Sequence, residues 1–197
     1  MKPVIIVDSG GANLASLRYA LRRLGAGAEV SADARTIRRA ARVLLPGVGA
    51  AACAMRRLNA FGLTAALPTL RQPVLGVCLG MQLLFERSEE GHTKCLGILP
   101  STVRGLEAAP GRPVPHMGWN TLRPLKPDPL LEGVTEGDYA YFVHSYSAPI
   151  TQDTLASAEY GKPLSAVVRR KNFWGTQFHP ERSADTGALI LRNFLRL

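Results

Sequence analysis

The stretch Pro73-Val74-Leu75-Gly76-Val77-Cys78-Leu79-Gly80 decides the fold. Its first five residues form a short apolar run with β-branched side chains, which is typical of a strand buried on both faces. A helical pattern over Leu79 to Phe85 begins almost at once. A buried strand that passes directly into a helix is a unit of an α/β protein. Cys78 lies at the predicted turn between the two elements.

The same alternation of strand and helix signals precedes this stretch. Val4 to Val7 is a fully apolar run that ends at Asp8-Ser9-Gly10-Gly11, and leucines at helical spacing follow until Gly25. Strands that alternate with helices predict a parallel sheet with helices on both faces, whose ligands bind beyond the carboxyl ends of the strands. Further predicted elements are strands at Glu29-Val30 and Val43 to Leu45, and helices at Ala34 to Ala41 and Ala50 to Leu58.

The second half of the chain has a different pattern. Prolines are frequent from Pro100 to Pro129, which predicts loops and short strands. We therefore predict one α/β domain over residues 1–197, with a three-layer, doubly wound, mostly parallel sheet and antiparallel strands in the second half. Predicted elements there are β-rich runs at Tyr139 to Tyr146, Ala166 to Arg170 and Phe173 to Phe178, and a last helix at Ala184 to Leu195.

Composition excludes several classes of protein. The 197 residues are 46% apolar and 20% charged, which suits a globular domain and not a disordered or collagen-like chain. No apolar run approaches the ~20 residues of a membrane span, and the segment Met1 to Asp8 lacks a signal-peptide pattern. We expect a cytoplasmic protein without a membrane partner. Three cysteines without Cys-x-x-Cys or zinc spacing predict neither a disulfide framework nor a metal site.

The net charge of +9 is compatible with three interpretations. A solvated, arginine-rich surface is the simplest, and an acidic protein partner comes second. Nucleic acid comes last, because no aromatic side chains interleave with the basic pairs as a stacking surface requires. We expect no nucleic-acid partner.

Cys78 has the sequence context of a nucleophile. Gly76-Val77-Cys78-Leu79-Gly80 follows the G-x-[Ser/Cys]-x-G pattern of a nucleophile elbow, in which a tight strand-to-helix turn exposes the reactive side chain. The helix N-terminus favours a thiolate, and its free N–H groups, notably that of Leu79, can hold an oxyanion. The alternative is a buried cysteine that packs as a small apolar residue. Cys53 and Cys95 lack flanking glycines and are predicted to be structural.

A glycine loop, Pro46-Gly47-Val48-Gly49, leaves the carboxyl end of another predicted parallel strand. The sheet should therefore bring this loop to the same edge as Cys78. A flexible backbone at that edge can direct an N–H group at a developing oxyanion, although Gly-x-Gly is also common in ordinary turns.

His179 is the candidate base for a cysteine nucleophile. Pro180 favours an extended conformation at His179, so that Glu181, two residues on, can hydrogen-bond the far imidazole nitrogen. None of the other histidines is followed by a carboxylate two residues on. His92 is predicted in a solvated loop, and packing or pocket-lining is the expected role of His116 and His144.

Three segments of the chain resemble the signatures of class I glutamine amidotransferases. This resemblance implies hydrolysis of glutamine to glutamate and ammonia through a thioester, without a cofactor or metal. It makes Cys78 the nucleophile, His179 the base and later the acid, and Glu181 the residue that orients His179. The three segments are Pro46-Gly47-Val48-Gly49, Gly76-Val77-Cys78-Leu79-Gly80-Met81-Gln82 and Phe178-His179-Pro180-Glu181.

The resemblance also assigns residues around the reacting centre. The oxyanion hole would consist of the amide of Leu79 and a glycine-loop amide, that of Gly49 or Val48. Glutamine itself would be held by Gly47, Gln82, Ser145 and Tyr146. The family often has threonine where Ser145 stands, and because serine keeps the hydroxyl we expect little change.

Further segments resemble one branch of the family, the glutaminase subunits of imidazole glycerol phosphate synthases in histidine biosynthesis. This resemblance implies that ammonia passes to a (β/α)₈-barrel cyclase subunit, which forms imidazole glycerol phosphate and the aminoimidazole-carboxamide ribonucleotide. A barrel needs ~250 residues, so the cyclase must be a separate chain in a heterodimer. Asn13, Trp119, Tyr139 and Arg182 match positions at the subunit contact, although Trp119 alone also suits a core residue. The segments are Asp8-Ser9-Gly10-Gly11-Ala12-Asn13-Leu14, Pro115-His116-Met117-Gly118-Trp119-Asn120 and Tyr141-Phe142-Val143-His144-Ser145-Tyr146.

Three other functions are compatible with part of this pattern. The chain could serve another synthase, of the pyridoxal phosphate or anthranilate type. It could be a free-standing cysteine hydrolase or peptidase, which would act on peptides or esters without a partner. It could also be a scaffold without activity, against which the intact cysteine, histidine and carboxylate argue.

Overall fold

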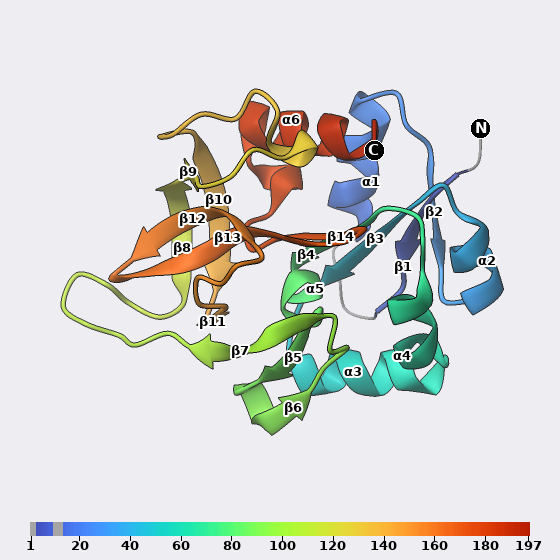
Figure 1. The fold of residues 1–197 in the computed structure, drawn as a ribbon, viewed down its shortest axis with the longest axis horizontal. Helices are drawn as coiled ribbons and strands as arrows, with labels where there is room; N and C mark the ends of the chain where they lie inside the picture. Colours follow the sequence, from blue (N-terminus) through green and yellow to red (C-terminus); the bar gives the residue numbers. More distant parts are fainter. Residues whose placement is uncertain (1–2, 10–13) are drawn as a thin grey trace.

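A computed structural model describes residues 3–9 and 14–197. Within them, eight strands form the main sheet (Figure 1). Along the chain they are β1 (Val4–Val7), β2 (Ala28–Ser31), β3 (Arg42–Gly47), β4 (Val74–Cys78), β9 (Arg123–Pro124), β12 (Thr154–Tyr160), β13 (Lys162–Arg170) and β14 (Phe173–Thr176). Their order in the sheet is β2-β1-β3-β4-β14-β13-β12-β9.

The sheet has a parallel part and an antiparallel part. Strands β2, β1, β3, β4 and β14 are parallel, while β13, β12 and β9 continue the sheet in antiparallel fashion. This arrangement confirms the predicted α/β fold, with its antiparallel strands in the second half. Because β14 pairs with β4, the end of the chain returns to the middle of the sheet.

Helices cover both faces of the parallel part (Figure 1). Successive side chains of a strand point to opposite faces of the sheet, so each strand contributes to the core on both faces. In β1, Ile6 packs in the apolar cluster that contains residues of α1 and α6, whereas Ile5 packs in the cluster that contains residues of α2, α3 and α4. The α-helices are α1 (Leu14–Arg23), α2 (Ala34–Arg39), α3 (Ala51–Ala60), α4 (Leu63–Ala66), α5 (Leu79–Gln82) and α6 (Ala184–Phe194). The 3₁₀ turns are η1 (Leu67–Thr69), η2 (Glu90–His92), η3 (Pro129–Leu131) and η4 (Pro180–Arg182).

Two smaller sheets lie beside the main one. The first pairs β8 (His116–Thr121) with β10 (Tyr139–His144) in antiparallel register, with His116 opposite His144. The second has the order β11-β7-β5-β6. Its strands are β5 (Phe85–Ser88), β6 (Thr93–Lys94), β7 (Leu99–Gly105) and β11 (Tyr146–Ser147).

The helix predicted over Leu79 to Phe85 is wrong in length, because α5 ends at Gln82. Beyond it the Leu84 carbonyl accepts hydrogen bonds from the N–H groups of Ile98 and Leu99, both at 2.9 Å. The chain then continues as β5 beside β6 and β7. Pairing with a later segment therefore overrides the local helical pattern.

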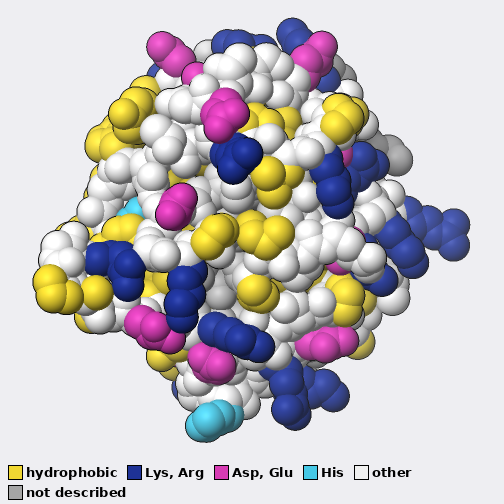
Figure 2. Space-filling view, turned by 60° about the vertical axis from the view of Figure 1, so that its left-hand side comes forward, with side chains coloured by type: hydrophobic (Ala, Val, Ile, Leu, Met, Phe, Trp, Pro, Cys, Tyr) yellow, Lys and Arg dark blue, Asp and Glu magenta, His cyan; other side chains and the backbone are white. Residues whose placement is uncertain are grey.

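Charge is distributed over the surface without a single basic stripe on the face that Figure 2 shows. There, Lys and Arg side chains are interspersed with acidic and apolar ones. The described part of the chain has no helix that is both long and apolar enough to span a membrane.

Close backbone packing fixes the junction between β4 and α5. A Cβ atom added at Gly80 would lie 1.7 Å from the Leu45 carbonyl oxygen of β3. A Cβ atom at Gly76 would lie 2.7 Å from the Gly80 oxygen. Only glycine allows the first turn of α5 to sit this close to β3, which explains the two glycines around Cys78.

Gly80→Ala should lower the free energy of unfolding by about 3 kcal/mol, because Leu45 belongs to a central strand and cannot move away. Gly27→Ala is the matched control, since nothing lies within 4 Å of a Cβ atom there. It should change stability by less than about 1 kcal/mol. Urea denaturation of both variants measures the difference, and equal stabilities would contradict this account of the junction.

Candidate active site

Cys78 ends β4 in an unusual backbone conformation. Its φ of 53° and ψ of −112° lie in a region that residues other than glycine rarely adopt. Such a strained turn between strand and helix matches the predicted elbow. Cys78 lines a cavity of about 460 Å³, where its Sγ lies 3.7 Å from the Val143 oxygen.

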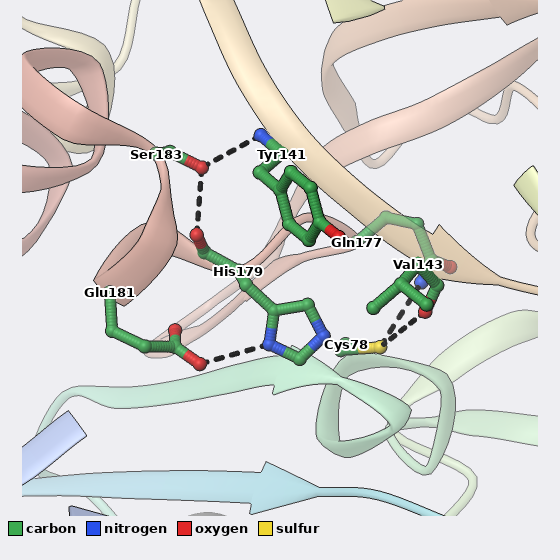
Figure 3. Close-up of polar contacts among 7 residues, drawn as sticks. All are labelled: Cys78, Tyr141, Val143, Gln177, His179, Glu181 and Ser183. Carbon is green, nitrogen blue, oxygen red and sulfur yellow. Dashed lines mark hydrogen bonds and ion pairs between the residues drawn. The ribbon is translucent and has the colours of Figure 1, made fainter. Parts of the chain in front are cut away.

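His179 reaches this cavity from the segment that follows β14. Its backbone N–H donates to the Tyr141 oxygen at 3.0 Å. The buried Ser183 hydroxyl donates to the His179 oxygen at 2.7 Å and accepts from the Tyr141 N–H at 2.9 Å (Figure 3). Tyr141 and Ser183 therefore clamp the backbone of His179 from two sides.

The imidazole of His179 lies between a carboxylate and the Cys78 thiol. His179 Nδ1 is 2.9 Å from Glu181 Oε1, and the opposite edge of the ring faces Cys78 (Figure 3). Burial by itself lowers the pKa of His179. Hydrogen bonds to Cys78 and Glu181, and the negative charges that both can carry, outweigh burial and raise this pKa to about 10. The site therefore favours an imidazolium beside the sulfur.

The glycine loop is held at both of its ends. The Ser9 hydroxyl donates to the Pro46 oxygen at 2.7 Å, and Gly47 is paired with Cys78 across β3 and β4. After the loop, Glu90 Oε2 accepts the Ala51 N–H at 2.7 Å. The intervening residues, Val48 and Gly49, line the cavity, and Gly49 has a positive φ of 81°.

Gln82 and Gln177 form a buried amide pair beside the sulfur. Gln82 Nε2 donates to the Tyr146 oxygen at 2.7 Å and to Gln177 Oε1 at 3.0 Å. Gln177 Nε2 in turn lies 3.9 Å from Cys78 Sγ. Gln82 thus braces the cavity wall at Tyr146.

Most predicted site residues lie around one cavity. Its lining includes Gly47, Val48, Gly49, Cys78, Leu79, Gln82, Ser145, Tyr146, His179, Glu181 and Arg182. The N–H of Leu79 belongs to the first turn of α5, where backbone N–H groups have no partner within the helix.

Trp119 and Tyr139 lie outside this cavity, on β8 and β10. Their exposed fractions are 53% and 58%, so Trp119 is not a core residue. Trp119 shares a second hollow with Glu181 and Arg182, which connects this surface to the cavity rim. Asn13, also predicted at the interface, lies outside the described residues.

Three residues near the cavity carry no prediction from the sequence, namely Glu90, Gln177 and Ser183. Gln177 and Ser183 lie next to the Phe178 to Glu181 segment, which is the only local indication of a role. The sequence does not show which distant residues their polar side chains contact. Glu90 lies in the charged segment around His92, where nothing local indicates that its carboxylate faces a cavity.

The remaining histidines and cysteines have different surroundings. His116 and His144 are buried, and burial lowers their pKa values to about 4 and about 3. Burial and the nearby Glu90 charge raise the pKa of the Cys95 thiol to about 11, whereas Cys53 is exposed on α3. Among the described residues, no group of three or more His, Cys, Asp and Glu side chains could hold a metal ion.

Comparison with known proteins gives the class first. The model of the family "Glutamine amidotransferase class-I" matches residues 5–197. A solved glutamine amidotransferase is 21% identical with a TM-score of 0.75, over 98% of this chain and 97% of that chain, which is a likeness of fold. The chain therefore belongs to the class I glutamine amidotransferases.

Two curated relatives give the particular family. The imidazole glycerol phosphate synthase subunits HisH of Xylella fastidiosa and Xanthomonas euvesicatoria pv. vesicatoria are each 56% identical to this chain. Both alignments cover 100% of this chain and 98% of the relative. Within the class, this chain belongs to the HisH family, as the resemblance in its motifs predicts.

Cys78→Ala should lower the pKa of His179 well below about 10, because it removes a hydrogen bond and a negative charge while burial remains. Glu181→Gln should lower it as well, and the double variant should lower it furthest. An NMR titration of the imidazole measures these shifts, with exposed His92 as the internal control. An unchanged pKa in both single variants would contradict the coupling.

Proposed function

We propose that this chain is the glutaminase subunit of an imidazole glycerol phosphate synthase in histidine biosynthesis. The supporting observation is that Cys78, His179 and Glu181 share one cavity in a chain of the HisH family. In this proposal Cys78 is the nucleophile, His179 the acid and base, and Glu181 the residue that orients His179.

The proposed reaction has two halves. The Cys78 sulfur attacks the side-chain amide carbon of glutamine, and the N–H of Leu79 together with that of Val48 or Gly49 stabilises the oxyanion. The His179 imidazolium gives its proton to the leaving nitrogen, so that the C–N bond breaks and ammonia departs from a glutamyl thioester. Neutral His179 then takes a proton from water, whose oxygen attacks the thioester. The C–S bond then breaks, which restores a Cys78 thiolate beside the His179 imidazolium, and the product leaves as glutamate after its new carboxylic acid loses its proton to solvent.

Glutamine would lie against the walls of the same cavity. Gly47, Gln82, Ser145 and Tyr146 are the proposed contacts, as the family resemblance implies. Glu90 adds a carboxylate to the lining, which suits the positive α-ammonium group of an amino acid.

The ammonia acceptor would be a separate cyclase subunit with a (β/α)₈ barrel. The relatives are named as subunits, which supports a partner chain. Exposed Trp119 and Tyr139, with Arg182 at the cavity rim, would form the contact together with Asn13. Val48 and Gly49 lie between the two held ends of the glycine loop, so the partner can bias the orientation of their amides. The isolated chain should therefore have low glutaminase activity.

Cys78→Ala should reduce glutamine hydrolysis in the complex by about three orders of magnitude or more, because the thioester cannot form. Glu181→Gln should cost less, because Glu181 orients the imidazole and does not react. Release of glutamate measures both effects. Cys53→Ala is the matched control, since this cysteine is exposed on α3 and away from the cavity. Near-native turnover in Cys78→Ala would reject the assignment.

Trp119→Ala should weaken association with the cyclase subunit by tenfold or more, because a large exposed aromatic side chain would lose its burial at the contact, worth about 2 kcal/mol. Phe61→Ala is the control, as it removes an exposed aromatic residue that follows α3. Titration calorimetry measures both affinities. Equal affinities of the two variants would contradict the proposed contact.

If the +9 charge steers association, the association rate should fall as salt is raised.

A further inference from the structure

Two buried histidines beside the cavity have no part in the proposed reaction. His116 and His144 face each other across β8 and β10, with His116 Nδ1 3.0 Å from His144 Nε2. They are 4% and 6% exposed, and their lowered pKa values leave both rings neutral at physiological pH. Each ring therefore carries one N–H group and one acceptor nitrogen.

The hydrogen bonds around this pair define a direction. His144 Nδ1 is 2.8 Å from the Tyr146 oxygen, and because a carbonyl only accepts, this nitrogen must carry the proton. His144 Nε2 is then an acceptor, so His116 Nδ1 donates to it. His116 Nε2 must in turn accept, and its neighbour at 3.3 Å is the Asn120 Nδ2 amide.

The hydrogen bonds of Asn120, at the other end of this series, require the same direction. The Thr121 N–H donates to Asn120 Oδ1 at 2.8 Å, which identifies the other amide atom of Asn120 as nitrogen. That nitrogen also donates to the Glu159 oxygen at 2.8 Å. From Asn120 through His116 and His144 to Tyr146, every donor therefore points toward the cavity. We call these four residues the histidine relay.

The relay ends on the carbonyl that holds the cavity wall. The Tyr146 oxygen receives His144 Nδ1 at 2.8 Å and Gln82 Nε2 at 2.7 Å, so both of its lone pairs are occupied. Two donors from different elements fix the orientation of this peptide group. This peptide group joins Tyr146 to Ser147, and Tyr146 lines the cavity together with the preceding residue, Ser145.

Packing alone does not account for two imidazoles here. The His116 ring is stacked between Phe142 and Tyr160, with ring centroids 4.9 Å and 4.0 Å apart. A phenylalanine would fill the same stack. All four imidazole nitrogens nevertheless have a hydrogen-bond partner, and the last bond in the series is to a wall residue.

We propose that His116 and His144 are positioning residues, which hold the Ser145–Tyr146 wall in the geometry that binds glutamine. This role rests on the proposed glutaminase function. The relay also connects that wall to β8, the strand that carries exposed Trp119.

The first test needs no variant. Nitrogen-15 NMR of the wild-type chain at pH 7 distinguishes the two neutral tautomers of histidine. The relay requires the Nδ1–H tautomer at both His116 and His144. An Nε2–H tautomer at either ring would overturn the proposed direction and with it the proposal.

The second test uses two substitutions that each keep one half of the His144 ring. His144→Asn places an amide near the Nδ1 position and can still donate to the Tyr146 oxygen. His144→Gln places its amide near the Nε2 position and loses that bond. The probe is a glutamine-analogue electrophile that alkylates Cys78, with the half-saturating concentration and the maximal rate measured separately. Leu155→Ala, a substitution at a buried residue outside the relay, is the control for lost stability.

The Gln variant should raise the half-saturating concentration by about tenfold and the Asn variant by less than about threefold, while the maximal rate changes little in either. Equal half-saturating concentrations in the two variants, or an effect of the same size in Leu155→Ala, would overturn the relay alone. A wild-type chain that the probe does not modify at Cys78 would overturn the proposed function and the relay together.

Discussion

The contact of the Gly80 backbone with the Leu45 carbonyl is the constraint on which the site depends. No side chain fits between them, since even a Cβ atom would lie 1.7 Å from that oxygen. The start of α5 is therefore locked against β3, and Gly47 comes to lie opposite Cys78 in the sheet. A candidate nucleophile and a candidate oxyanion loop are brought together by backbone packing, which side-chain motion cannot loosen.

Strand order supplies the third element of the site. Strand β14 pairs in parallel with β4, with Thr176 opposite Val77. The chain that leaves β14 therefore passes Cys78, the residue that follows Val77. Three residues beyond Thr176, His179 is clamped by Tyr141 and Ser183. The distance of about a hundred residues along the chain becomes a contact because the last strand inserts beside the fourth.

Local patterns were sufficient for the parts of the fold that local chemistry controls. The apolar run before Cys78 and its flanking glycines predict the elbow, and the His179–Glu181 spacing predicts their bond, which the structure contains at 2.9 Å. The pairing of β14 with β4 could not be predicted, because both strands are buried on both faces and have no alternation of apolar and polar residues that would set their register. The end of α5 at Gln82 could not be predicted for a different reason, since the chain beyond it is held by hydrogen bonds from the distant residues Ile98 and Leu99. The histidine relay needs both β8 and β10 in place, so neither histidine discloses its role alone.

Two histidines that line the cavity, His144 and His179, and His116 beside them have pKa values that move in opposite directions. Burial lowers the pKa of each, but His179 has Cys78 and Glu181 as partners that can be negative, whereas His116 and His144 hydrogen-bond only neutral groups. Around neutral pH the first is therefore an imidazolium and the other two are neutral rings. A charged relay would lose its acceptor nitrogens and could not keep one direction. In the proposed reaction, a neutral relay would keep the cavity wall fixed while His179, which faces the sulfur, carries the proton that the leaving nitrogen needs.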